Sequence, residues 1–143
     1  MIKQIKNVKQ YSIPVVLAIN KFESDTEKEI EIIRKAVIEA GAINAVTSTH
    51  FTDGGKGSID LAHAVIKAAE QPKSFNYLYN SEQSIEEKFE TIVKKMYGGA
   101  AIEISPEAQR KIDVYEKQGF GNLPICIAKT QYSLSHDATL KGV

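Results

Sequence analysis

The chain has 143 residues, of which 43% are hydrophobic and 25% charged, an ordinary balance for one soluble globular domain. Its 18 basic and 18 acidic side chains cancel, so composition supplies no excess positive charge for nucleic acid or an anionic membrane. A single cysteine, Cys126, excludes a fold built on internal disulfides. No run approaches the about 18 apolar residues that span a bilayer, and the first residues lack the apolar core of a signal peptide. We therefore expect a cytoplasmic protein without nucleic-acid or membrane partners.

The first half of the chain alternates short apolar runs with amphipathic segments. Residues 1–10 have the pattern of the end of a helix, and residues 14–19 predict a strand that is covered on both faces. Asp25 is a good N-cap for a helix that Gly41 is placed to end. A second strand is predicted over residues 42–47. A polar loop over residues 49–58 follows it.

The next helix is predicted over residues 59–70, and Pro72 stops it. Its predicted inward residues are Leu61, Ala62, Val65, Ile66 and Ala69.

The second half continues the alternation. Ser84 and Glu87 form the pattern of a capping box, which predicts a helix from there through Tyr97. A third strand is predicted over residues 100–104. The sequence Ser105-Pro106 is typical of a helix start, and that helix is predicted to run to Gln118. A fourth apolar run covers residues 123–128, and residues 129–143 show no clear period.

Alternating buried strands and helices predict an α/β fold: a mostly parallel sheet flanked by helices, in a three-layer Rossmann-like arrangement. We expect a single domain over residues 1–143, truncated at both ends. Ligands of such sheets bind beyond the carboxyl ends of the strands. The loops that meet this condition are residues 20–24, 47–57 and 129–137.

The first of these loops begins Asn20-Lys21-Phe22-Glu23. It resembles the Asn-Lys-x-Asp loop with which GTPases bind a guanine base, and a nucleotide-binding module of that type is one alternative. However, glutamate replaces aspartate, and the chain has no Gly-x-x-x-x-Gly-Lys-Ser/Thr phosphate loop. The other alternative is a polar turn before the next helix.

The second loop contains Gly54, Gly55, Lys56 and Gly57 after an aromatic residue, Phe51. Glycines allow a backbone to approach a ligand closely, and a lysine suits an anion. Glycine-rich turns also occur where no ligand binds, as in an α/β interaction domain. Phe51 is a candidate either for the core or for stacking on a flat ring.

The third loop carries no pattern that assigns it a role. Cys126 lies inside an apolar run, which predicts a small buried side chain rather than a nucleophile. The three histidines, His50, His63 and His136, have no partner at metal-ligand spacing. The segment Lys129-Thr130-Gln131-Tyr132 has no assignable function from its residues alone.

Three segments together resemble the formate–tetrahydrofolate ligase family. Residues 15–27 are similar to the family's Asn-x-Phe-x-Thr-Asp-Thr-Glu stretch, and residues 49–57 to its His-Trp-Ala-x-Gly-Gly-x-Gly loop. Residues 119–133 nearly reproduce its Gly-Phe-Gly-x-Leu-Pro-x-Cys-x-Ala-Lys-Thr-Gln-Tyr-Ser segment. The likeness covers the whole chain in the right order, which identifies it as a fragment from the C-terminal region of such a ligase.

The resemblance implies ATP-dependent formylation of tetrahydrofolate at N10, with formyl phosphate as the intermediate. It also implies a fold related to the P-loop class, a homotetrameric parent, and Mg²⁺ and a monovalent cation bound outside this region. The family's phosphate loop lies N-terminal to the part present here. We therefore expect no catalytic residue in this chain, and no formate- and folate-dependent release of ADP by it alone.

The resemblance further implies that part of the folate pocket is present. The family's pterin walls match Phe22 and Glu23 on the first loop, and Thr47 and Phe51 on the second. Phe51 replaces the family's tryptophan. Many members have proline in place of Glu23 and leucine in place of Thr47, so this pocket is more polar. Asn20, Lys21 and the glycine loop are expected as further loop or nucleotide contacts.

Overall fold

The computed structural model describes residues 1–72, 74–127, 134 and 139, in two compact units, Met1–Asn76 and Tyr77–Val143. The first unit contains the sheet, and the second contains helices α5 and α6. That residues 1–143 form a single domain stays a prediction.

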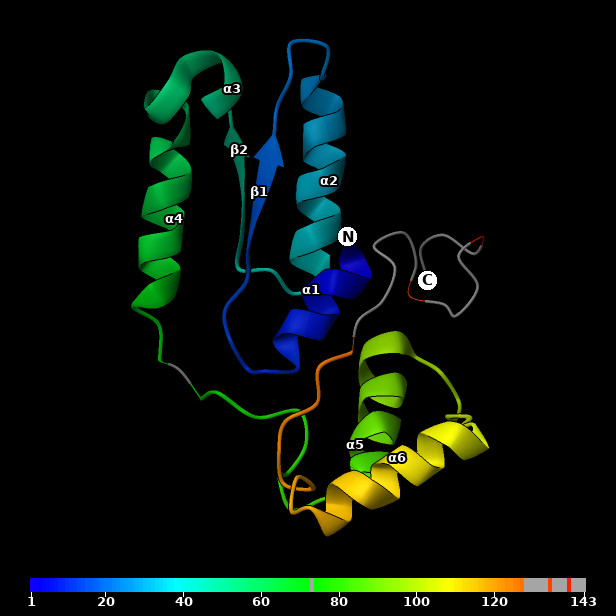
Figure 1. Cartoon of the computed structure of the whole chain (residues 1–143). Coiled ribbons are helices and arrows are strands. Elements are labelled where there is room, and N and C mark those ends of the chain that lie inside the picture. Colours follow the sequence, from blue (N-terminus) through cyan, green and yellow to red (C-terminus); the bar gives the residue numbers. More distant parts are fainter. Residues whose placement is uncertain (73, 128–133, 135–138, 140–143) are drawn as a thin grey trace. The chain divides into compact units, whose positions relative to one another are not determined.

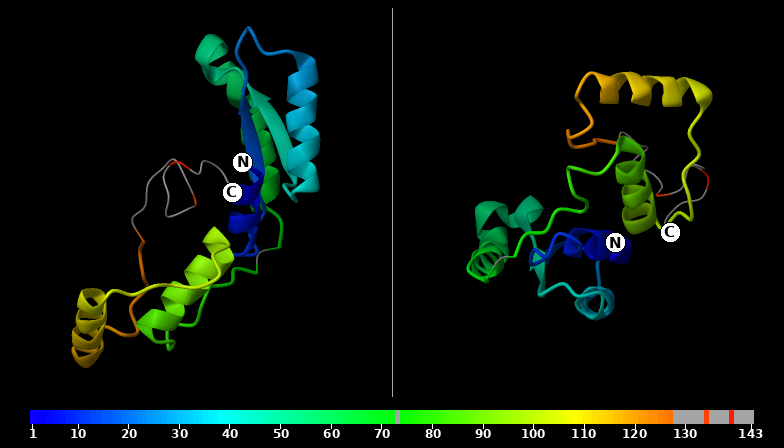
Figure 2. Two further views of the ribbon diagram at one scale, coloured as in Figure 1. Left: turned by 90° about the vertical axis from the view of Figure 1, so that its right-hand side faces the viewer. Right: turned by 90° about the horizontal axis from the view of Figure 1, so that it is seen from below.

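The first unit is built on two parallel strands, β1 (Val16–Asn20) and β2 (Asn44–Ser48). Helix α2 (Glu27–Glu39) connects the strands on one side of the sheet, and α4 (Ile59–Ala69) lies on the other (Figures 1 and 2). The expected α/β class, with a parallel sheet flanked by helices, is confirmed.

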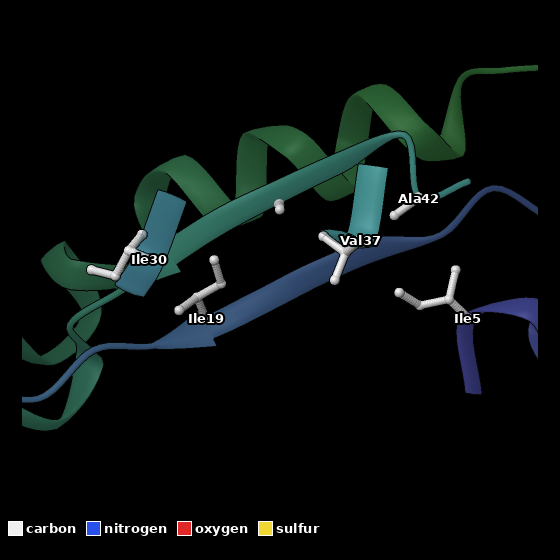
Figure 3. Packing of buried hydrophobic residues seen from close by; sticks show 6 residues of the cluster. Ile5, Ile19, Ile30, Val37 and Ala42 are labelled. Carbon is white, nitrogen blue, oxygen red and sulfur yellow. The ribbon is translucent and has the colours of Figure 1, made fainter. Parts of the chain in front are cut away.

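The core of this unit lies between the sheet and α2. Its buried apolar residues come from α1 (Ile2–Lys9), from both strands, from α2 and from the turn before β2. Figure 3 shows how they converge on one face of the sheet; they are Ile5, Ile19, Ile30, Val37, Ala42 and Ala45. This cluster fixes the position of the strand ends that carry the candidate site.

The two ends of α2 have well-formed caps. The N-cap is Thr26 and not Asp25 as predicted, because the Thr26 side chain accepts the Glu29 amide while the Glu29 carboxylate accepts the Thr26 amide. Asp25 instead accepts the amide of Phe22 at 2.8 Å. At the other end Gly41 has a φ of +99°, a left-handed conformation that favours glycine.

The capping box makes the stability of this unit depend on pH. Hydrogen bonds from the backbone and then the side chain of Thr26 hold the pKa of Glu29 below its ordinary value of 4.5. A lowered folded-state pKa contributes stability that is present above the unfolded-state pKa and is lost as pH falls through the folded-state value. We therefore expect the urea midpoint difference between the unmodified chain and Glu29→Gln to be constant near neutral pH and to shrink below about pH 4.5. A difference that grows on acidification would contradict this.

Helix α4 packs with a different face from the one predicted. Ala64 and Ala68 are buried against the sheet, whereas four of the predicted inward residues are exposed: Ala62, Val65, Ile66 and Ala69. Leu61 is half-buried as the prediction implied. Small alanines let the helix approach the strands closely, and periodicity alone favoured the larger side chains.

The second unit consists of α5 (Ile85–Ile92), which continues as a π-helical turn, η2 (Val93–Tyr97), and of α6 (Pro106–Lys117). The predicted capping box of Ser84 and Glu87 is confirmed, and so is the Ser105 cap with Pro106 in the first helical turn. Among the described residues of this unit, the buried ones are Leu78, Ile85, Lys88, Ile92 and Ile112.

Two predicted strands are wrong. Neither residues 100–104 nor the described part of the fourth run, residues 123–127, forms a strand. An apolar run becomes a strand only where another strand accepts its backbone hydrogen bonds, and Pro124 has no amide hydrogen to donate. Within the described parts of the chain, no helix is both long and apolar enough to cross a membrane.

Candidate functional site

The candidate site lies where the two strands end side by side. Asn20 and Ser48 are partners in the parallel register, and the Lys21 amide donates to the Ser48 carbonyl at 3.0 Å, one residue beyond the ladder. The loop after β1 is therefore adjacent to the segment after β2. Figure 1 shows helix α3 (His50–Asp53) at this end of the sheet.

Two aromatic side chains meet at this edge. The ring centroids of Phe22 and Phe51 are 6.1 Å apart, and the rings are tilted by 53°. Phe22 is 54% exposed and Phe51 is 78% exposed, so neither belongs to the core. Exposed aromatic surface at the carboxyl end of a parallel sheet makes this edge a candidate for ligand binding.

The loop that carries Phe22 is held by its own polar groups. Asp25 accepts the Phe22 amide, and the Lys21 ammonium forms an ion pair with Glu27 on the first turn of α2. The hydrogen bond from Lys21, and then its charge, lower the pKa of Glu27. In a GTPase-like module this loop would bind a nucleotide base. Here the Lys21 side chain of the loop is already paired with the Glu27 carboxylate. Asn20 and Glu23 are exposed.

The segment that carries Phe51 is helical, not the irregular loop that the sequence predicted. It forms α3 and a 3-10 turn, η1 (Gly54–Ser58). Thr49 closes the turn of α3. Asp53 accepts the Thr49 hydroxyl at 2.6 Å, and the Asp53 amide donates to the Thr49 carbonyl at 2.8 Å.

The glycines of this segment differ in their surroundings. A Cβ atom on Gly57 would lie 2.6 Å from the backbone carbon of Thr49, whose amide donates to the Gly57 carbonyl at 3.0 Å. Open space surrounds Gly54 and Gly55, and Lys56 is exposed. Gly57 therefore serves the packing of the segment itself, while its neighbours leave the backbone accessible.

A buried hydroxyl network at the end of β2 was not predicted. Ser48 is 2% exposed, and its Oγ atom lies 3.2 Å from His50 Nδ1 and 3.1 Å from Ser58 Oγ. These contacts connect the strand end to α3 and to the start of α4. Thr47, a predicted wall of the pocket, is half-buried and is the register partner of Ile19.

The remaining candidate residues lie elsewhere. Cys126 is exposed rather than buried, because the predicted fourth strand that would have covered it does not form. The segment Lys129-Thr130-Gln131-Tyr132 and His136 lie outside the described residues. Among the residues that are described, no three or more His, Cys, Asp or Glu side chains gather as they would around a metal ion.

Comparison with known proteins covers the full chain. The family model for formate–tetrahydrofolate ligase matches residues 1–143. The chain is 71% identical over 143 residues to the cytoplasmic C-1-tetrahydrofolate synthase of Saccharomyces cerevisiae, and 65% identical to the mitochondrial one. It is 52% identical over 141 residues to the cytoplasmic C-1-tetrahydrofolate synthase of Homo sapiens. These matches include 99–100% of this chain but only 15% of each relative, so the chain spans about 15% of their length.

Proposed function

Because this chain belongs to the formate–tetrahydrofolate ligase family, we propose that it supplies part of the tetrahydrofolate site of such a ligase. The parent enzyme would use ATP and formate to formylate tetrahydrofolate at N10 through formyl phosphate. The observation that carries the proposal is the exposed pair Phe22 and Phe51 at the carboxyl ends of the two strands. Glu23 and Thr47 would complete the walls of the pocket.

The geometry of the aromatic pair suits a flat heteroaromatic ring. A ring held between two aromatic faces needs centroids about 7 Å apart, twice the about 3.5 Å contact distance of carbon atoms. The observed 6.1 Å is close to that separation, but the 53° tilt must decrease before a pterin fits between the rings. Since both side chains are exposed and outside the core, they turn without breaking a buried contact.

The phosphate chemistry is assigned to other parts of a longer protein. The 143 residues contain no phosphate loop, and Lys21 is engaged by Glu27. We propose that a nucleotide domain outside this chain binds ATP and formate, that the parent is a cytoplasmic homotetramer, and that this chain alone is inactive. Mg²⁺ and a monovalent cation would bind in the parent, outside this chain.

Truncation of Phe51 tests the proposal. We expect the unmodified chain to bind tetrahydrofolate in titration calorimetry. Phe51→Ala is expected to bind about 5- to 150-fold more weakly, because stacking of a base on an aromatic side chain contributes about 1–3 kcal/mol. Phe51→Trp enlarges the ring face and is expected to bind at least as tightly as the unmodified chain.

Phe75→Ala is the matched control, since Phe75 is also an exposed phenylalanine of the first unit, at 53%, and stacks on Tyr11 instead. Its affinity is expected to be unchanged. Equal affinities for the unmodified chain and Phe51→Ala, or an equal loss in Phe75→Ala, would remove Phe51 from the site.

A further inference from the structure

Lys88 is a fully buried lysine in the second unit. It lies on α5 between Ile85 and Ile92, at the three- and four-residue spacing of the buried face, and its exposed fraction is 0%. No described carboxylate forms an ion pair with it. A buried ammonium is costly unless hydrogen bonds replace its water, so its neighbours must supply them.

The neighbours of the ammonium come from a different part of the chain. Nζ donates to the carbonyl of Gly121 and, at 3.3 Å, to that of Leu123, and it lies 6.0 Å from the centroid of the Tyr79 ring. An ammonium has three N–H donors, and two carbonyls with one ring face match that number. The cage is therefore made of backbone and ring rather than of acidic side chains.

Tyr79 connects the same cage to the next residues. Its hydroxyl oxygen accepts the Ile125 amide at 2.8 Å, so one ring contacts both the ammonium and the backbone of the segment. In Figure 1 the chain after α6 runs back towards α5 as this segment, drawn in orange. The described residues 121–125 form neither helix nor strand, so the cage is what connects their backbone to α5.

We propose that Lys88 and Tyr79 are positioning residues that fix the backbone path of residues 121–125. These residues belong to the segment 119–133, whose sequence nearly matches that of the family. The role is independent of the proposed folate site, because it rests on contacts within the second unit. The charge of Lys88 is essential to this role, because a side chain of equal length without the ammonium leaves the carbonyls of Gly121 and Leu123 without its donor.

Amide hydrogen exchange of the 143-residue chain tests the proposal. In Lys88→Met we expect exchange of the Leu123 and Ile125 amides to rise about tenfold or more, the scale of one hydrogen bond to a charged group. The Gln118 amide, which ends α6 by bonding the Val114 carbonyl, is expected to keep its rate. An unchanged Ile125 rate, or an equal rise at Gln118, would overturn the proposal, since an equal rise reports loss of the whole unit.

A second test variant and a control variant complete the experiment, and the second test variant remains informative if Lys88→Met fails to fold. Tyr79→Phe removes only the hydroxyl acceptor, so exchange of the Ile125 amide should rise while Leu123 stays protected. Lys94→Met is the matched control, because the Lys94–Glu90 pair is exposed and contributes little; a rise at Ile125 in this variant would overturn the proposal.

Chemical rescue separates the ammonium from mere packing. Lys88→Ala removes the atoms of a propylammonium ion, and adding propylammonium is expected to return the Ile125 exchange rate towards that of the unmodified chain. Propanol, a neutral molecule of similar size, is expected not to restore the Ile125 exchange rate. Equal rescue by propanol would overturn the requirement for charge.

Discussion

Replacement of Ile30 by alanine is expected to lower the free energy of unfolding of the first unit by about 2–5 kcal/mol. Ile30 is 2% exposed and belongs to the buried cluster, and Figure 3 shows its side chain on α2 beside Ile19, at one end of that cluster. Truncation removes apolar area from the core and leaves a cavity that the short sheet is poorly able to close. The two strands are also the only ladder that positions Phe22 and Phe51 within the described residues, so the site depends on this packing.

Urea unfolding followed by far-ultraviolet circular dichroism measures the effect. The matched control is Ile32→Ala, on the same helix two residues later, where the side chain is 61% exposed. Since its truncation removes little buried area, we expect a change within about 0.5 kcal/mol. Equal losses in the two variants would show that the buried cluster is not what stabilises α2 on the sheet.

Gly57→Ala is the second change with a large expected effect. Its Cβ atom would lie 2.6 Å from the Thr49 backbone carbon and 2.7 Å from the Thr49 carbonyl oxygen, distances that side chains essentially never show. Because the obstacle is backbone, the turn between β2 and α4 must shift, at a cost of about 1–3 kcal/mol. The shift also moves the segment that carries Phe51, so we expect a loss of tetrahydrofolate affinity together with the loss of stability.

Gly55→Ala is the control for this change, since a Cβ atom at Gly55 meets nothing within 4 Å and needs no unusual backbone angle. Urea unfolding and titration calorimetry are expected to find Gly55→Ala close to the unmodified chain in both stability and affinity. If Gly55→Ala is as damaging as Gly57→Ala, the close contact with Thr49 is not the cause.

Much of the fold was predictable because its signals are local. The capping box of Ser84 and Glu87 and the Ser105-Pro106 start depend only on residues three apart or adjacent, and both are confirmed. The predicted strands over residues 14–19 and 42–47 correspond to β1 and β2, shifted by one or two residues.

Signals that depend on distant partners failed. Residues 100–104 have the composition of a strand but find no strand to pair with. Lys88 occupies a position that helical spacing assigns to the core, although a lysine side chain is ordinarily exposed. Its burial depends on the carbonyls of Gly121 and Leu123, which are far away in the sequence.

The candidate site was predictable only in part. Parallel strands end at the same edge of a sheet, which is why Phe22 and Phe51 meet although they are far apart in sequence. The ion pair of Lys21 with Glu27 and the contacts of Ser48 with His50 and Ser58 depend on side-chain positions that the sequence does not encode locally. These contacts hold the two segments that carry the aromatic pair.

We propose that a folate ring binds at the edge where β1 and β2 end. The most direct test of this proposal is an NMR titration of the ¹⁵N-labelled 143-residue chain with tetrahydrofolate. We expect saturable shifts of backbone amides confined to residues 20–23 and 49–57, with the shifts of Phe22 and Phe51 among the largest. Saturable binding that leaves these amides unmoved and shifts others, or no saturable shift at all, would contradict it.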